Sequence, residues 1–407
     1  MVVRDIHKFD DPYFEEFQRL VDRRGTGCKK WDLLDKIFGE HPKGMLPFWI
    51  ADTEFRSPDP VIGALRDRVE HGVFGYPVRD GQVSQAVAEW WGRRHRFDVD
   101  PRWVCHSHGV MGGIAVSLRV FTSPGDPVVV QTPIYPPFRW VVENNQRRLV
   151  ENPLVERDGV YRMDLAGLER AFRGGARAML LCSPHNPTGR VWTREELREV
   201  AGLAERYRVL VISDEIHGDL VYPGDHAHIP FPSVSPWALD NSLLFASPSK
   251  SFNLAGFYTA YAIIPDGAKR KAYEAEMNRL FMDQGNELGQ VAMKAAYLEG
   301  EAWLNGLVRY LEGNRGRAVE FLRGMRGVRV TIPEGTFLMW IDFGGMLRGR
   351  GLTAGEFLKG AGVALNKGES FGEGFELYGR LNFGCPRQML DEGLQRIRSR
   401  AEELGLL

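Results

Sequence analysis

Lys250 is the residue whose position most clearly suggests chemistry, because it lies between two serines in the segment Ser247–Asn253. The apolar residues 243–246 directly before this segment read as a short buried strand. A lysine at the mouth of a buried strand is poorly solvated, and burial would lower the pKa of its amine from about 10.4. Such an amine can attack a carbonyl group and form a Schiff base. Taken alone, Lys250 also fits an ordinary loop lysine that follows a strand.

Short apolar segments alternate with helical segments through the middle of the chain. Strands that are apolar on both faces are typical of a largely parallel sheet with helices on both sides. The expected strands are 127–131, 176–182, 209–213 and 243–246. The expected helices are 13–23, 60–71, 82–96, 134–144 and 193–206, with another that begins near Val110 after a short strand and a glycine turn. Thr193 and Glu196 have the spacing of a capping box at the start of the helix 193–206.

The C-terminal part of the chain has a different pattern. A long helical region, 268–323, is interrupted near Gly285 and Gly300, and short strands mixed with two helices follow it, as in a small α+β domain. Because 407 residues are too many for one compact core, we expect more than one domain. The expected units are an N-terminal arm, 1–50, that belongs to the small domain, a large domain, 51–289, and a small C-terminal domain, 290–407.

Four residues that can bind or react are expected at one place in this fold: Gly109, Asn186, Asp214 and Lys250. Each follows an expected strand, and in a parallel sheet the carboxyl ends of the strands form the edge at which ligands bind. The turn at Gly109 leads into a helix whose first amides favour an anion such as a phosphate. On its own this turn equally fits a tight connection without a ligand. The convergence of all four residues is what indicates a ligand site.

Together these residue types describe a site for pyridoxal phosphate. Lys250 would join the aldehyde of the cofactor, and Asp214 would hold a proton on the ring nitrogen, which the ring needs to act as an electron sink. Asn186 could donate a hydrogen bond to the ring oxygen O3′, and Tyr135 could stack on the ring face. The phosphate could approach the backbone at Gly109. Its expected donors are the amides of Val110 and Met111 and the hydroxyls of Ser247 and Ser249.

Several motifs resemble those of fold type I pyridoxal phosphate enzymes in the aminotransferase class I/II superfamily. Within it, the chain resembles most the cystathionine β-lyase (C–S lyase) group of the MalY/PatB type, over nearly its whole length. The resemblance implies an α/β fold of the pyridoxal phosphate-dependent transferase type I, with a large domain on a mostly parallel sheet and a smaller α+β domain. The motifs are Phe-Trp-Ile-Ala-Asp-Thr-Glu-Phe (48–55), Gly-Tyr-Pro (75–77), Ser-Pro-His-Asn-Pro-Thr-Gly (183–189), Ser-Asp-Glu-Ile-His (213–217), Ser-Pro-Ser-Lys-Ser-Phe-Asn (247–253) and Arg-Leu-Asn-Phe-Gly-Cys-Pro-Arg (380–387).

The resemblance also implies roles for individual residues. Lys250 would carry the cofactor and later move the proton of the substrate α-carbon. Arg380 would bind the substrate α-carboxylate through both arms of its guanidinium fork. The backbone of Ala51 would lie near the same carboxylate. Tyr76 would reach the cofactor phosphate of a neighbouring subunit, so the resemblance implies a homodimer with shared active sites.

Two positions depart from the pattern of many relatives. A tyrosine often stands three residues after the ring-pairing aspartate, where this chain has His217, and a phosphate-binding arginine often stands eight residues after the lysine, where this chain has Tyr258. Both departures fit the lyase group better than the aminotransferases. We expect His217 to contact the cofactor region.

Composition excludes several other classes of function. The chain has 52 basic and 53 acidic residues, and this balance does not favour binding to nucleic acid or to an anionic membrane. The start of the chain does not resemble a signal peptide, and no apolar run reaches the length of a membrane span. Four scattered cysteines, Cys28, Cys105, Cys182 and Cys385, suggest neither a disulfide framework nor a metal site. We therefore expect a cytoplasmic protein without a metal.

The sequence thus predicts a pyridoxal phosphate-dependent C–S lyase that releases thiol, pyruvate and ammonia from a β-thioether amino acid such as cystathionine. An aminotransferase on the same fold is the alternative, and a specialised biosynthetic enzyme on an unusual amino acid is also open. A regulatory protein that docks to a partner is the alternative from another class, although no motif marks a docking surface.

Overall fold

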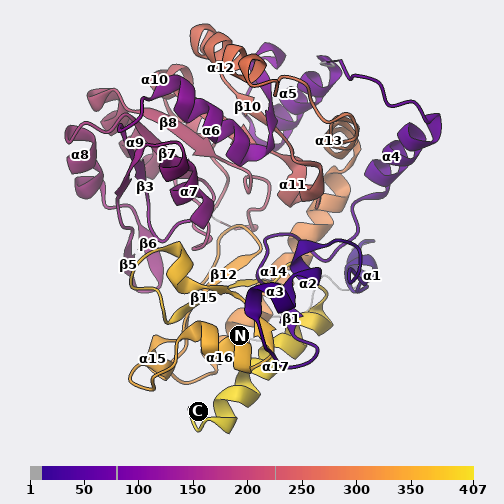
Figure 1. The fold of residues 1–407 in the computed structure, drawn as a ribbon, viewed down its shortest axis with the longest axis vertical. Helices are drawn as coiled ribbons and strands as arrows, with labels where there is room; N and C mark the ends of the chain where they lie inside the picture. The colour runs from indigo at the N-terminus through magenta and orange to yellow at the C-terminus, as the bar shows by residue number, and fades with distance from the viewer. Residues whose placement is uncertain (1–11, 79–80, 225) are drawn as a thin grey trace.

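A seven-stranded sheet forms the centre of the larger part of the molecule in the computed structural model, which describes residues 12–78, 81–224 and 226–407 (Figure 1). Its strands are β2 (Val104–His108), β3 (Pro127–Val130), β4 (Arg148–Glu151), β7 (Ala178–Cys182), β8 (Leu210–Asp214), β9 (Ser242–Ala246) and β10 (Thr259–Ile263). Their order in the sheet is β2-β10-β9-β8-β7-β3-β4. The neighbours from β9 to β4 run parallel, whereas β10 is antiparallel to both β9 and β2. The predicted largely parallel sheet is confirmed.

Helices cover both faces of this sheet. On one face pack α6 (Gly109–Phe121), α7 (Pro136–Asn144) and α12 (Gly267–Arg279), and on the other α8 (Leu165–Arg173), α9 (Arg194–Tyr207) and α10 (Pro236–Asn241). Successive residues of one strand therefore enter different cores. Val128 and Val130 of β3 join the core under α6, and Val129 joins the core under α9. This two-sided burial explains why the strands read as continuous apolar runs.

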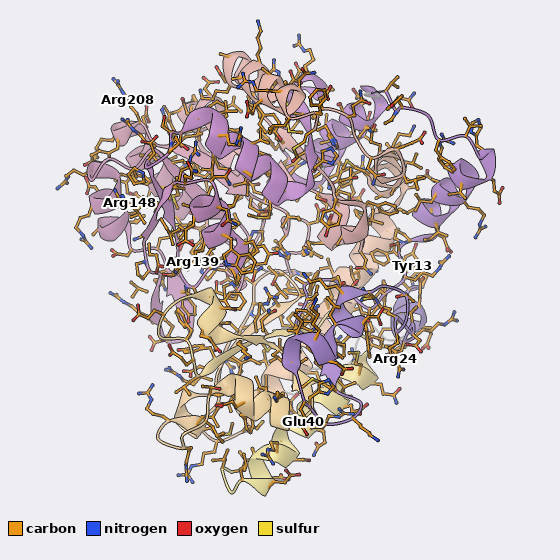
Figure 2. The ribbon with its side chains drawn as sticks, viewed as in Figure 1. Tyr13, Arg24, Glu40, Arg139, Arg148 and Arg208 are labelled. Carbon is orange, nitrogen blue, oxygen red and sulfur yellow. The ribbon has the colours of Figure 1, made fainter. Side chains whose placement is uncertain are left out.

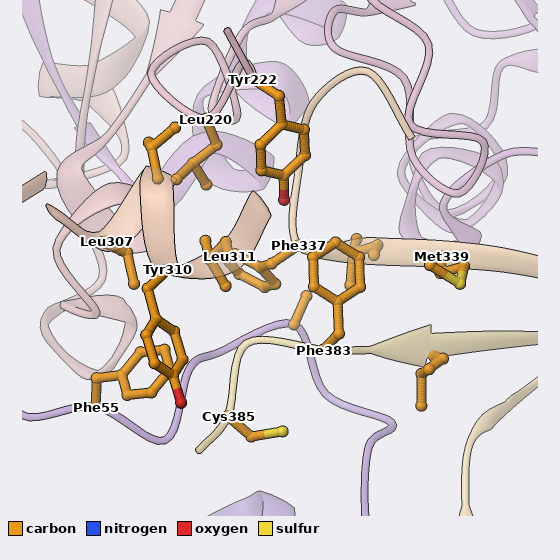
Figure 3. Close-up of a cluster of buried hydrophobic side chains, with 14 of the residues drawn as sticks. Phe55, Leu220, Tyr222, Leu307, Tyr310, Leu311, Phe337, Met339, Phe383 and Cys385 are labelled. Carbon is orange, nitrogen blue, oxygen red and sulfur yellow. The ribbon is translucent and has the colours of Figure 1, made fainter. Parts of the chain in front are cut away.

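The C-terminal part of the chain forms a second, antiparallel sheet with the strand order β11-β12-β15-β14. Its strands are β11 (Arg329–Thr331), β12 (Leu338–Asp342), β14 (Asn366–Lys367) and β15 (Tyr378–Asn382), and its helices are α14 (Glu301–Arg323), α15 (Gly344–Leu347), α16 (Ala354–Gly360) and α17 (Arg387–Glu403). Figure 3 shows Leu307 and Leu311 of α14 in one buried cluster with Phe337 and Phe383. The predicted small α+β unit is present.

The N-terminal arm lies against this C-terminal part (Figure 1). It contains α1 (Phe14–Phe17), α2 (Lys29–Asp32), α3 (Leu34–Phe38) and β1 (Leu46–Pro47), and β1 pairs in parallel with β13 (Val363–Ala364). The predicted helix 13–23 is wrong beyond residue 17. The reason is Arg23, whose guanidinium binds the carboxylates of Asp52 and Glu54 and so draws the chain away from a helical path.

The remaining helices are α4 (Asp59–His71), α5 (Gly81–His95), α11 (Pro248–Ser251) and α13 (Glu287–Glu299), and β5 (Val155–Arg157) forms a hairpin with β6 (Val160–Arg162). The predicted interruptions of the region 268–323 are confirmed, because α12, α13 and α14 are separate helices. The boundary near residue 290 stays a prediction; it falls within α13, which packs on α4 and α5. Across the described ranges, no helix combines the length and the apolarity that crossing a bilayer would need. Charged side chains such as Arg208 project from the surface (Figure 2).

Candidate active site

A cavity of about 370 Å³ lies where the carboxyl ends of β7, β8 and β9 meet the amino end of α6. Gly109, Asn186, Asp214 and Lys250, the four residues expected at one edge of the sheet, all line it. Residues far apart in the sequence meet here because each follows a strand of the same sheet. The structure therefore brings the reactive groups together around one space.

Lys250 lies in the short helix α11, directly after the buried strand β9. The hydroxyl of Ser247 accepts a hydrogen bond from the Ser249 amide and so caps the start of this helix. The Lys250 amine donates to the carbonyl oxygen of Ala51 at 2.6 Å. Burial is the main reason that the pKa of Lys250 is lowered to about 8. A sizeable fraction of the amine is therefore uncharged, and nucleophilic, near neutral pH.

Asp214, the last residue of β8, supplies a buried carboxylate to the same cavity. Its Oδ1 atom accepts a hydrogen bond from the Ile216 amide at 3.1 Å. Burial raises the pKa of Asp214 to about 7, and neither that amide nor the charge of Lys250 offsets the burial fully. A carboxylate in this state lacks a close positive partner, and a protonated ring nitrogen in the cavity would supply one.

The amino end of α6 offers donors for an anion. Gly109 has a φ of 67°, in the left-handed region that glycine adopts without strain, and it turns the chain from β2 into α6. Val110 and Met111 in the first turn also line the cavity, as does Ser249. Ser247 does not line it: its hydroxyl lies 2.6 Å from that of Ser249 and donates to the carbonyl of Thr259. Its predicted contact with a phosphate stays a prediction, and its observed contact orients Ser249.

Asn186, Tyr135 and His217 complete the polar lining. The Oδ1 atom of Asn186 accepts a hydrogen bond from Arg380 at 3.0 Å, which leaves its amide nitrogen available as a donor. His217 is buried, and burial lowers the pKa of its imidazole well below the usual range, so the ring is neutral. Within the described residues its Nδ1 atom has no hydrogen-bond partner. A polar ligand would therefore relieve an uncompensated buried atom.

Arg380 lies on β15 and does not line the cavity itself, but it contacts Asn186, which does. Its guanidinium donates to Asn186, to the carbonyl of Trp49 at 2.8 Å and to Oδ1 of Asn366 at 2.5 Å. Burial lowers its pKa to about 10, so it remains a cation at neutral pH. Its Nε atom has no partner in the described part of the chain. A buried cation with an unused donor is well suited to bind a carboxylate.

Tyr76 lies apart from these residues. Its side chain is 95% exposed and does not line the cavity. It belongs to a loop in which Val73, Phe74 and Val78 are exposed as well. Its contact with the cofactor of a second subunit stays a prediction.

Six further residues line the cavity without having been assigned to it from the sequence: His108, Gly112, Cys182, Ile216, Ala255 and Tyr258. Cys182 ends β7 in register with Asp214, and its sulfur accepts a hydrogen bond from the Asn186 amide at 3.4 Å. Its position at a strand end, the same signal that singled out Asp214, could have identified it. The ring of His108 forms a hydrogen bond with the carbonyl of Gln284.

The family model for aminotransferase class I and II matches residues 51–397. The chain belongs to this family. Cystathionine beta-lyase PatB from Bacillus subtilis (strain 168) is 39% identical over 389 residues, which cover 94% of this chain and 99% of that protein. The structure of cystalysin from Treponema denticola, which contains a pyridoxal 5'-phosphate cofactor, is 30% identical with a TM-score of 0.90 and covers 95% of this chain and 99% of that one. A PLP-bound C-S lyase from Staphylococcus hominis is 29% identical with a TM-score of 0.88, over 94% of this chain and 97% of that one.

The predicted family and fold are therefore confirmed, and this aminotransferase class I and II enzyme uses pyridoxal phosphate. The cavity fits that cofactor on its own chemistry. It presents a largely buried amine at Lys250, a carboxylate without a close cation at Asp214, and a helix start at Gly109. It also contains the unpartnered imidazole nitrogen of His217.

Proposed function

We propose that the chain is a carbon–sulfur lyase that cleaves β-thioether amino acids such as cystathionine. With water consumed, the products are a thiol, pyruvate and ammonia. The observation that carries this proposal is the near full-length similarity to cystathionine beta-lyase PatB, together with a cavity that holds the groups this chemistry needs. His217 and Tyr258, the two positions that depart from the aminotransferase pattern, both line that cavity.

Lys250 is the proposed catalytic base. Bound in the cavity, pyridoxal phosphate supplies an aldehyde that joins covalently to amines and a ring that draws electrons from the substrate α-carbon. Lys250 would hold the cofactor in the absence of substrate, and its Nζ atom, once free, would take the proton from the substrate α-carbon. A pKa of about 8 suits this transfer because the amine is neither permanently charged nor too weak a base.

The other groups bind and orient. Arg380 binds the α-carboxylate through its guanidinium, which burial keeps free of competing water. Asn186 lies between Arg380 and the cavity and can donate to the cofactor through its amide nitrogen. Asp214 holds the proton of the ring nitrogen, which keeps electron demand at the α-carbon high. The neutral imidazole of His217 can hydrogen-bond a polar atom of the cofactor or substrate without adding charge.

We also propose that two copies of the chain form a homodimer with shared sites. The support is a set of exposed apolar side chains, which in a monomer would face water: Val73, Phe74, Tyr76, Val78, Tyr258 and Phe281. Tyr76 is the loop residue expected to reach the cofactor of the partner subunit. Tyr258 lines the cavity itself. A cytoplasmic location is proposed as well, because all four cysteines are free thiols.

The test is to offer cystathionine to the purified, cofactor-loaded protein without any 2-oxo acid. A lyase releases thiol, pyruvate and ammonia in equal amounts under these conditions. An aminotransferase would release none of the three. Once a 2-oxo acid is added, it would instead transfer the amino group of cystathionine to that acid and leave the carbon–sulfur bond intact. Lys250→Ala, which removes the proposed base, serves as the matched negative control.

A further inference from the structure

Residues 49–55, which begin at the end of the N-terminal arm and which we term the strap, pass the cavity and are held largely through their backbone carbonyls. The carbonyl of Ala51 accepts the hydrogen bond of the Lys250 amine at 2.6 Å. Two residues earlier, the carbonyl of Trp49 accepts from the guanidinium of Arg380 at 2.8 Å. One short segment thus touches both the proposed base and the proposed carboxylate-binding residue.

Two asparagines fix the register of the strap. Asn382 donates to the carbonyl of Ile50 at 2.5 Å and to that of Asp52 at 2.6 Å. From the other side, Asn253 donates to the carbonyl of Phe55 at 2.8 Å. If the strap slipped by one residue, every one of these donors would face the wrong carbonyl.

A buried cluster of charges ties the strap to the arm that precedes it. Lys30 is 1% exposed, and its Nζ atom lies 3.0 Å from the Asp52 carbonyl oxygen, 3.3 Å from the Asp52 carboxylate and 2.5 Å from the Glu54 carboxylate. Arg23 binds Asp52 through both arms of its guanidinium, at 3.1 and 2.9 Å. Two cations therefore face two carboxylates. Asp52 is a partner of both cations.

Lys30 holds the strap in two ways at once. Its side chain binds the carbonyl of Asp52, the residue next to Ala51. Its own backbone carbonyl accepts a hydrogen bond from the indole of Trp49 at 3.0 Å. A fully buried ammonium loses much of its solvation, so it holds its partners tightly, and a partner left alone would be strongly destabilised. Lys30 does not line the cavity, although its charge is close enough to help lower the pKa of Lys250.

We propose that Lys30 is a positioning residue: it fixes the register of the strap, and thereby the carbonyls of Ala51 and Trp49 that aim Lys250 and Arg380. This inference builds on the roles proposed above for Lys250 and Arg380. When the strap loosens, the guanidinium of Arg380 loses one of its anchors, and the α-carboxylate is bound less well. The Lys250 amine loses its acceptor at the same time.

The test compares Lys30→Met with Arg24→Met in the cofactor-loaded protein. Arg24 is the matched control, because it belongs to the same arm but pairs with Asp22 at the surface, where both side chains are 68% exposed (Figure 2). Lys30→Met should raise the KM for cystathionine about tenfold or more, whereas Arg24→Met should leave it unchanged. Hydrogen exchange of peptides that cover the strap should speed up by a similar factor in Lys30→Met alone.

A double variant separates positioning from stability. Lys30→Met with Glu54→Gln removes one cation and one carboxylate, so the melting temperature should recover towards that of the wild type. The strap exchange and the KM should stay altered, because the Asp52 carbonyl has lost one of its two donors, the Lys30 amine, and keeps the other, Asn382. If Lys30→Met does not fold, Glu54→Gln alone should give the same changes to a smaller extent.

Two results would overturn the inference: wild-type strap exchange and KM in folded Lys30→Met, or recovery of both in the double variant. The second result would mean that Lys30 only balances charge. A wild-type protein that fails to cleave cystathionine would instead refute the proposed function. Strap exchange in that protein would still test the role of Lys30.

Discussion

Replacing Asp214 with asparagine should stabilise the folded cofactor-free protein. It should also weaken the binding of pyridoxal phosphate. In the absence of a ring nitrogen, the Asp214 carboxylate is buried with one backbone hydrogen bond and no close cation. Ionising it there costs free energy, and asparagine, which has nearly the same shape, carries no charge. With the cofactor bound, aspartate is favoured over asparagine, because its carboxylate pairs with the protonated ring nitrogen.

The magnitude follows from the pKa of Asp214, which burial raises from 3.8 to about 7. A carboxyl group with a raised pKa costs the folded state nothing at low pH. Between the unfolded and folded pKa values the unfolded chain loses its proton first, so the stability of the wild type falls as pH rises. With about 1.4 kcal/mol for each pKa unit, the wild type should lose about 2.6 kcal/mol relative to Asp214→Asn between about pH 5 and about pH 8.

Urea unfolding of the cofactor-free wild type and variant at these two pH values measures the difference. Asp98→Asn, which changes an exposed aspartate, controls for the general effect of removing a carboxylate. A stability difference between Asp214→Asn and the wild type that stays the same at both pH values would refute the reasoning. Equilibrium dialysis should show that Asp214→Asn binds pyridoxal phosphate about tenfold more weakly or worse, since a charge-assisted hydrogen bond is lost.

Three further outcomes are expected. The rate at which the cofactor-free protein takes up pyridoxal phosphate should rise with pH and reach half of its limit near pH 8, because the neutral Lys250 amine is the attacking form. Stopped-flow absorbance that shows no rise would contradict this. Arg380→Lys should lower kcat/KM for cystathionine by about 30-fold, equivalent to about 2 kcal/mol, because an ammonium cannot replace the fork that binds the carboxylate, Asn186 and the strap; a loss below threefold would exclude the assigned role. Tyr76→Ala should weaken pyridoxal phosphate binding while sedimentation still shows a dimer, and unchanged affinity would remove Tyr76 from the shared site.

Local features of this fold could be predicted because their causes are local. The capping box of Thr193 and Glu196 forms with both of its hydrogen bonds, and the glycines near 285 and 300 separate three helices as expected. The strand β8 reads as buried because apolar residues on both of its faces meet a core, which placed Asp214 at the edge of the sheet. One sheet then brings such strand ends together.

Contacts between distant segments were not predictable in the same way. Asn186 meets Arg380 across 194 residues, and no local pattern in the sequence announces that pair. Lys30 looked like an ordinary residue of a polar arm, yet it is buried against the strap. The helix expected over 13–23 ends early because Arg23 finds partners 29 to 31 residues further on. In each case long-range pairing of a charged side chain overrides the local preference.

The most direct test of the account is to reduce the cofactor-loaded protein with borohydride and map the modified peptide by mass spectrometry. Reduction fixes the cofactor to whichever amine holds it. The account predicts a single pyridoxyl group on Lys250. A label on any other lysine, or a protein that takes up the cofactor without forming a reducible bond, would contradict it.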